Sequence, residues 1–197
     1  VEGYLLMMGG RPIDQEMAEA VDKLGLPYVA VDAYRVDGSS PCTGMNIQSG
    51  QLIAAHLADL GHRDLALLGL NPSNCHTTER LDGIMQVVRD RGLTLASDSI
   101  IENTEGYHGP QAGDIYATRL LDAGKAVSAI MCMNDIIALG AMHALHKRGV
   151  RIPEDISVTG FDDVCVDVTV TEENRLSAYL WPALTTVRVP HSDMGRR

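Results

Sequence analysis

The chain has 197 residues, of which 45% are hydrophobic, so it is long enough to bury a core. Its 26 acidic and 16 basic residues give a net charge of −10, which argues against a direct contact with DNA, RNA or an anionic membrane, because phosphate binding needs clustered Lys and Arg. No signal segment opens the chain and no apolar run could span a membrane, so we expect a cytoplasmic protein. Its four cysteines are widely spaced, and we expect neither a metal site nor a cofactor.

Apolar strands alternate with amphipathic helices along the chain, which is the pattern of parallel βα units. The predicted strands are 3–8, 28–32, 65–69, 128–133, 156–161 and 185–189. Helical stripes lie between them, formed by Met17, Val21 and Leu24; Ile53, Leu57 and Leu60; Leu81, Ile84, Met85 and Val88; Tyr116 and Leu120; and Ala138, Ala141, Met142 and Leu145.

Most of the predicted helices are followed by a glycine suited to a left-handed C-cap, namely Gly25, Gly61, Gly92, Gly124 and Gly149. Two polar segments, 34–44 and 164–179, interrupt the alternation. The pattern predicts an α/β protein in which helices flank parallel sheets.

Polar side chains follow the predicted strands at their carboxyl ends, where doubly wound sheets hold their ligands. These residues are Asp32, Asn71, Arg80, Asn134, Asp135, Asp162 and Asp163. An amide both donates and accepts, a carboxylate accepts from hydroxyl groups, and a guanidinium is a planar fork of donors. The set predicts a site for a small polyhydroxylated ligand.

Each of these residues also has a structural interpretation when it is taken alone. Asp135 directly precedes a predicted helix, so we expect it to be the N-cap, which would leave Asn134 to face the ligand. Asp163 suits a turn, and a lone Arg80 on a first helical turn is commonly solvated or salt-bridged. The coincidence of these residues, more than any one of them, favours a ligand site.

Catalytic motifs are weak in this sequence. His191, Ser192 and Asp193 are adjacent like a fragment of a nucleophile set, but a triad is assembled in space and the G-x-S-x-G elbow is absent. Neither G-x-G-x-x-G after a strand nor G-x-x-x-x-G-K-[ST] occurs. We expect a binding protein and no enzyme.

The most specific stretch is 151–163, RIPEDISVTGFDD, in which Gly160 predicts a close approach, followed by PALTTV at 182–187. With segments 55–63, 79–83, 129–135 and 138–141, these residues resemble the effector-binding core of the lactose/galactose-repressor family of bacterial transcription regulators. The resemblance implies two Rossmann-like subdomains of the periplasmic-binding-protein type. We expect residues 1–45 in an incomplete first subdomain, 46–181 in the second, and 182–197 returning to the first, with the chain truncated at both ends.

Carried over from this resemblance, the family's effector contacts fall on Arg80, Asn134 and Asp162, with Asp32, Asn71 and Phe161 as weaker candidates. The implied partner is a small-molecule effector, a sugar first and a purine-like compound second. Its binding between the subdomains would change the operator affinity of a homodimer, acting through a helix-turn-helix domain that is absent from this chain. We expect no membrane partner.

Two other classes stay open at this point. A periplasmic sugar-binding protein of a transport system would share the fold and the cleft, but it would carry a secretion signal. An enzyme of doubly wound fold would need a nucleophile, a base or a cofactor loop. The wording of 60–63 and of 151–163 favours the regulator.

Overall fold

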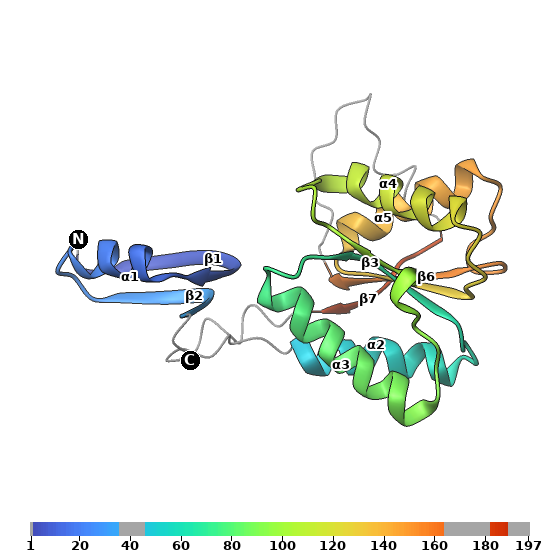
Figure 1. The fold of residues 1–197 in the computed structure, drawn as a ribbon, viewed down its shortest axis with the longest axis horizontal. Coiled ribbons are helices and arrows are strands. Elements are labelled where there is room, and N and C mark those ends of the chain that lie inside the picture. The colour runs from blue at the N-terminus through green and yellow to red at the C-terminus, as the bar shows by residue number, and fades with distance from the viewer. Residues whose placement is uncertain (1, 36–45, 164–181, 189–197) are drawn as a thin grey trace.

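The computed structural model describes residues 2–35, 46–163 and 182–188, and it contains two parallel sheets (Figure 1). The first sheet pairs β1 (Tyr4–Ile13) with β2 (Tyr28–Arg35), and helix α1 (Gln15–Asp22) connects them. The second sheet has five parallel strands in the order β4-β3-β5-β6-β7. The predicted α/β class with parallel sheets is confirmed.

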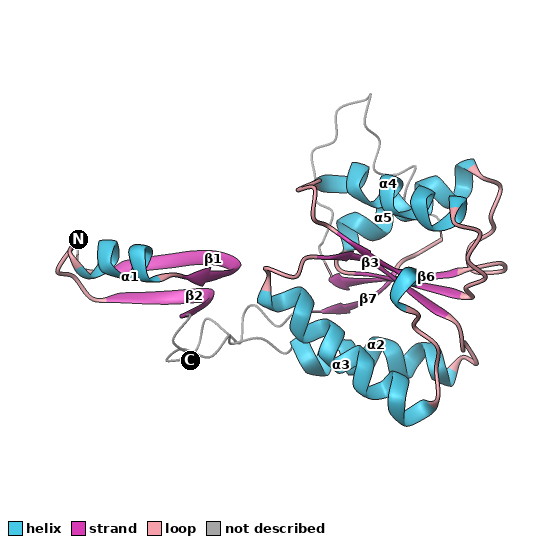
Figure 2. Cartoon of the chain, in the orientation of Figure 1, coloured by secondary structure: helices cyan, strands magenta, loops and turns pink. Residues whose placement is uncertain are grey.

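Helices cover both faces of the five-stranded sheet (Figure 2). Helices α2 (Asn46–Asp59) and α3 (Cys75–Arg91) pack together on one face, and α4 (Gly109–Asp122) and α5 (Asp135–Lys147) pack on the other. The strands are β3 (Leu65–Leu70), β4 (Ile100–Glu102), β5 (Ala129–Cys132), β6 (Ser157–Asp162) and β7 (Thr185–Arg188). Because both faces are covered, the central strands β3 and β5 are buried along their whole length and read as continuous apolar runs.

The glycines predicted to follow the helices all have a positive φ: Gly25, Gly61, Gly92, Gly124 and Gly149 lie between 61° and 93°. Three side chains of the predicted helical stripes are exposed in the described structure, namely Met17, Leu24 and Leu60. The main core is built by the second sheet and by the inner faces of α2 to α5.

The strand predictions differ from the structure in several places. Strands β1 and β2 run to Ile13 and Arg35, beyond the predicted ends at 8 and 32, so the expected position of Asp32 at a strand's carboxyl end is wrong. Strand β4 has three residues and was not predicted. Strand β7 pairs with β6 in the second sheet, with Thr185 beside Thr159, so the expected return to the first subdomain at residue 182 is wrong for residues 185–188. The rest of the division into subdomains stays a prediction. Of the predicted polar segment 34–44, residues 34 and 35 belong to β2 and residues 36–44 lie outside the described residues, as does the segment 164–179.

Within each helix pair, the two helices approach each other closely at glycines. A Cβ added to Gly50 of α2 would lie 2.1 Å from the carbonyl oxygen of Arg80 in α3, and one added to Gly83 of α3 would lie 2.0 Å from a carbonyl oxygen of α2. Gly113 and Gly140 bring α4 and α5 together in the same way. Larger side chains at these positions would force the helices apart.

The strand order reverses beside β3. The chain passes from β3 to β4 on one side and then to β5 on the other side of β3. In open α/β sheets, such a reversal leaves a crevice at the carboxyl ends of the strands. The residues that follow β3 and β5 therefore lie where a ligand site is expected.

Candidate functional site

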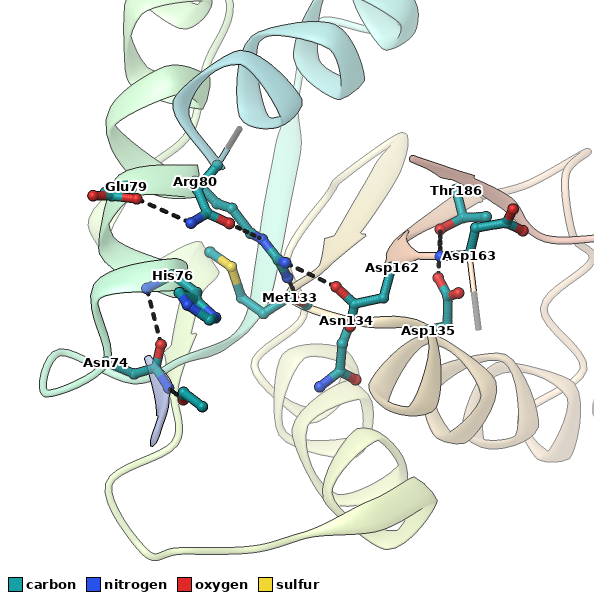
Figure 3. A network of polar contacts seen from close by, with 12 residues as sticks. Asn74, His76, Glu79, Arg80, Met133, Asn134, Asp135, Asp162, Asp163 and Thr186 are labelled. Atoms are coloured by element: carbon teal, nitrogen blue, oxygen red, sulfur yellow. Dashed lines mark hydrogen bonds and ion pairs between the residues drawn. The ribbon is translucent and has the colours of Figure 1, made fainter. Parts of the chain in front are cut away.

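Arg80 is at the centre of the polar network at this edge of the sheet (Figure 3). It lies in the second turn of α3 and is only 6% exposed. Its Nε donates to Oδ1 of Asn46 (3.2 Å), Nη1 to the carbonyl oxygen of Met133 (2.5 Å) and Nη2 to Oδ1 of Asp162 (2.8 Å). The guanidinium carbon also lies 4.7 Å from the ring centroid of Phe161. Contacts from α2, from the end of β5 and from β6 thus hold the planar fork in one orientation.

The start of α3 sets where Arg80 lies. Asn74 is the N-cap, and its Oδ1 accepts from the backbone N–H of His76 (2.9 Å). The helix begins at Cys75, five residues after β3 ends, so Arg80 stays beside the carboxyl edge of the sheet. The amide nitrogen of Asn74 donates to the carbonyl oxygen of Gly9 in β1 (2.9 Å). This hydrogen bond joins the site's edge to the first sheet.

Asn46 connects α2 to the same network. It is 6% exposed, its Oδ1 accepts from Arg80, and its Nδ2 donates to Oε2 of Glu79 (3.0 Å). The close approach at Gly50, one turn further along α2, brings the two helices near enough for these contacts. Asn46 is therefore a positioning residue for Arg80.

Strand β6 ends in two aspartates with unusual backbone conformations. The φ of Asp162 is 101° and that of Asp163 is 50°, a region that residues with a side chain rarely adopt. Long-range contacts hold both residues: Arg80 binds Asp162, and Nε of Arg188 donates to Oδ2 of Asp163 (2.6 Å). Backbone strain of this kind costs about 1–3 kcal/mol per residue and concentrates at functional sites. The Asp162 side chain is 28% exposed, whereas that of Arg80 is 7% exposed, so the carboxylate is the more accessible partner.

The predicted N-cap of α5 is wrong. Asn134 is the cap, because its Oδ1 accepts from the backbone N–H of Ile137 (2.8 Å). Asp135 is buried instead, and its Oδ1 accepts from the hydroxyl of Thr186 in β7 (2.6 Å). Both residues are good caps, and the neighbouring strand decides between them. The cap uses only Oδ1, so the amide nitrogen of Asn134 takes no part in it.

The approach of Asp135 to the sheet depends on a glycine in β6. A Cβ on Gly160 would lie 2.3 Å from Oδ1 of Asp135, which confirms the close approach predicted for this position. Thr186 also accepts from the backbone N–H of Asp163 (3.3 Å). Strands β6 and β7 and the start of α5 are thereby tied together beside the site.

The weaker candidates have structural roles or lie beyond the described side chains. Phe161 is fully buried, and its ring supports Arg80. The side-chain oxygen of Asn71 accepts from the backbone N–H of Ser73 (3.0 Å), which closes the loop before α3. The side chain of Asp32 lies outside the described residues. A ligand contact of any predicted site residue stays a prediction.

Three parts of the network were not predicted: the role of Asn46, the carbonyl oxygen of Met133, and Thr186. Asn46 lies 34 residues before Arg80, and only the packing of α2 on α3 brings them together. A backbone carbonyl leaves no trace in a sequence. Thr186 was visible within the motif at 182–187, but its partner Asp135 was expected to cap a helix.

The groups at this edge act through hydrogen bonds and charge. Burial, followed by the nearby Asp135, raises the pKa of the Cys132 thiol far above its usual range, so this thiol stays protonated. Within residues 2–35, 46–163 and 182–188, no cluster of three or more His, Cys, Asp or Glu is arranged to hold a metal ion. The arrangement can bind a ligand that carries hydroxyl groups.

The fold and the polar network define an α/β domain in which buried and partly buried polar side chains meet at the carboxyl edge of a parallel sheet. Residues 54–197 match the periplasmic binding protein-like domain family, and the chain belongs to this family. No helix in the described part of the chain is long and apolar enough to cross a membrane.

The relatives of this chain include bacterial transcription regulators. The chain is 29% identical over 198 residues to the HTH-type transcriptional repressor PurR of Vibrio cholerae, a match that covers all of this chain and 54% of the repressor. The chain therefore spans about half the length of this relative.

Solved structures give the same picture. A sugar-binding transcriptional regulator of the LacI family from Escherichia coli, in complex with phosphate, superposes with a TM-score of 0.76 at 29% identity and covers 98% of this chain and 65% of the other. The transcriptional regulator CelR in complex with cellobiose has a TM-score of 0.76 at 26% identity, with 100% of this chain and 56% of the other covered.

Proposed function

We propose that this chain is the ligand-sensing domain of a bacterial DNA-binding transcription regulator, and specifically of a repressor. A small effector binds at the carboxyl edge of the second sheet, between the two subdomains. A sugar is the first candidate and a purine-like compound the second. The observation that carries the proposal is the network that fixes Arg80 against Asp162 at the reversal of the strand order.

The chemistry of the network supports a hydroxylated effector. The Asp162 carboxylate is partly exposed and can accept hydrogen bonds from hydroxyl groups. Asn134 directly follows Met133, whose carbonyl oxygen accepts from Arg80, and its Nδ2 is a hydrogen-bond donor. Arg80 is already oriented, so little conformational entropy is lost when a ligand arrives. A sugar effector is also supported by two similar structures, a regulator described as sugar-binding and a regulator in complex with cellobiose.

The proposed mechanism requires that the effector bind between the two subdomains. A ligand that contacts both subdomains favours one angle between them, and its effect on the equilibrium equals its difference in affinity for the two states. The hydrogen bond from Asn74 to Gly9 is one contact between the two sheets near the site that such a change would alter. In a homodimer, the change would alter the spacing of helix-turn-helix domains on operator DNA.

A thermal-shift screen of the purified chain, and in parallel of the protein encoded by its complete reading frame, tests the proposal. The compounds are neutral sugars, nucleosides and purines. At a ligand concentration of about one hundred dissociation constants, binding stabilises the folded state by about 2.7 kcal/mol. We expect at least one compound to raise the melting temperature and Asp162→Ala to abolish that rise.

Asp122→Ala is the matched control, because Asp122 is an exposed carboxylate that pairs with Arg148 at the end of α4. This variant should keep the full ligand response. A folded protein that responds to none of the compounds would contradict the proposed function.

A periplasmic sugar-binding protein is the second candidate, because the matching family is described as periplasmic binding protein-like. The complete reading frame distinguishes the two. A helix-turn-helix segment ahead of this domain supports the regulator, and a secretion signal there supports the transport protein.

A further inference from the structure

We propose that the site selects an uncharged, hydroxyl-bearing effector over the phosphorylated form of the same compound. This inference rests on the proposed function and concerns the charge of the ligand. Arginine at a ligand site commonly recognises phosphate or carboxylate groups. The contacts of Arg80 argue against that use here.

The charge of Arg80 is already neutralised within the protein. Its Nη2 lies 2.8 Å from Oδ1 of Asp162, and its Nε and Nη1 donate to Asn46 and to the carbonyl oxygen of Met133. Only 7% of the Arg80 side chain is exposed. A phosphate group could reach the guanidinium only by displacing Asp162, and displacement would leave that carboxylate without its counter-ion.

Carboxylates outnumber guanidinium groups among the described side chains of this network. The carboxylates belong to Glu79, Asp135, Asp162 and Asp163, and the guanidinium groups to Arg80 and Arg188. Arg188 is bound to Asp163 at 2.6 Å. An anionic ligand would therefore meet repulsion, which is strengthened where water is excluded.

The helix N-termini at this edge do not offset the excess of carboxylates. Asn74 and Asn134 cap α3 and α5 with their side-chain oxygens, and Asp135 places a carboxylate in the first turn of α5. These oxygens face the positive ends of the helix dipoles, where an anion would otherwise be stabilised.

A neutral polyol fits the groups that remain. Asp162 is 28% exposed, and only its Oδ1 has an assigned partner within the described residues. A hydroxyl group can donate to the carboxylate and accept from the amide nitrogen of Asn134 without adding charge. The site thus favours hydroxyl groups where a phosphate ester would be excluded.

Calorimetric titration with paired compounds tests the inference. The pairs are glucose and glucose 6-phosphate, galactose and galactose 1-phosphate, ribose and ribose 5-phosphate, and inosine and inosine 5′-monophosphate. For the pair whose neutral member binds, we expect the phosphate to bind at least about tenfold more weakly, the ratio expected from one modest like-charge contact.

Variants assign the selectivity to the carboxylate. Asp162→Asn removes the charge and keeps an acceptor oxygen, so the discrimination against the phosphate should shrink several-fold. Asp122→Asn makes the same charge change at a distant exposed ion pair and should leave the discrimination unchanged.

A phosphate that binds the wild-type protein as tightly as its neutral partner, or more tightly, would overturn the inference and leave the sensor function standing. This comparison needs no variant, so it decides the matter even if Asp162→Asn fails to fold. If no member of any pair binds, the inference and the proposed function both fail.

Discussion

Two Arg–Asp pairs lie at opposite ends of strand β6, and they differ in sequence separation and in solvent exposure. Arg151 and Asp155 are four residues apart before the strand, with side chains 70% and 38% exposed. Arg80 and Asp162 are 82 residues apart at its end, with side chains 7% and 28% exposed. The first pair closes a local turn, because Asp155 also accepts from the backbone N–H of Arg151. The second pair exists only in the folded protein, so it is the one that can serve a site.

Removal of Arg80 should have the largest effect on stability. Arg80→Ala leaves Asp162 without its counter-ion and leaves the buried Asn46 and the Met133 carbonyl without a donor. We expect the free energy of unfolding to fall by about 2–4 kcal/mol, since loss of one partner of a buried pair is strongly destabilising. Urea denaturation measures it. The matched change Arg151→Ala should lower the free energy of unfolding far less, because this pair is solvent-exposed. Equal losses in the two variants would contradict this difference between the pairs.

A methyl group at Gly50 should disturb the buried pair without touching either of its residues. The Cβ of Gly50→Ala would lie 2.1 Å from the carbonyl oxygen of Arg80, so α2 and α3 must separate. We expect a loss of about 1–3 kcal/mol from overpacking, together with weaker ligand binding. Gln48→Ala, at an exposed position of the same helix, is the control. If Gly50→Ala leaves both stability and affinity unchanged, the helices do not position Arg80.

Loss of the α5 cap should have a smaller effect. Asn134→Ala removes the acceptor for the backbone N–H of Ile137, and we expect a loss of about 1 kcal/mol by urea denaturation. Asn134→Asp keeps an acceptor and should stay close to the wild type. A neutral Asn134→Ala variant would mean that Asn134 does not cap the helix.

The smallest effect is expected at the exposed pair, and it should depend on pH. The hydrogen bonds from Arg151 lower the pKa of Asp155 to about 2, below its ordinary value of 3.8. The stabilisation by this carboxylate is therefore present above about pH 4 and is lost as the pH falls through about 2. Asp155→Asn should be slightly less stable than the wild type at pH 7, and the gap should close near pH 2. A gap that persists at pH 2 would contradict this assignment.

Most of the secondary structure could be predicted because its sequence signals are local. Continuous apolar runs such as 65–70 and glycines after helices are local signals, and they predicted the α/β class and most elements. Strand β4 has only three residues, two half-buried and one exposed, so it left no run or alternation to detect.

Long-range polar contacts were only partly predictable. Asp162 and Arg80 stand out because each follows a strand, but nothing local pairs Arg80 with Asn46 on another helix. The choice between Asn134 and Asp135 as the cap depended on Thr186, 51 residues beyond Asp135. Contacts of this kind are decided by which elements the fold brings together, and a local reading of the sequence does not contain them.

A crystal structure of the protein with the sugar that stabilises it most would test the proposed site directly. We expect a sugar hydroxyl within hydrogen-bonding distance of the Asp162 carboxylate, with Arg80 still held by Asn46 and Met133. The opposite end of β6 offers a contrasting position, a cavity of about 350 Å³ lined by residues that include Met142, His146 and Arg151. A sugar ordered in that cavity, with no contact to Asp162, would contradict a site at the carboxyl edge of the sheet.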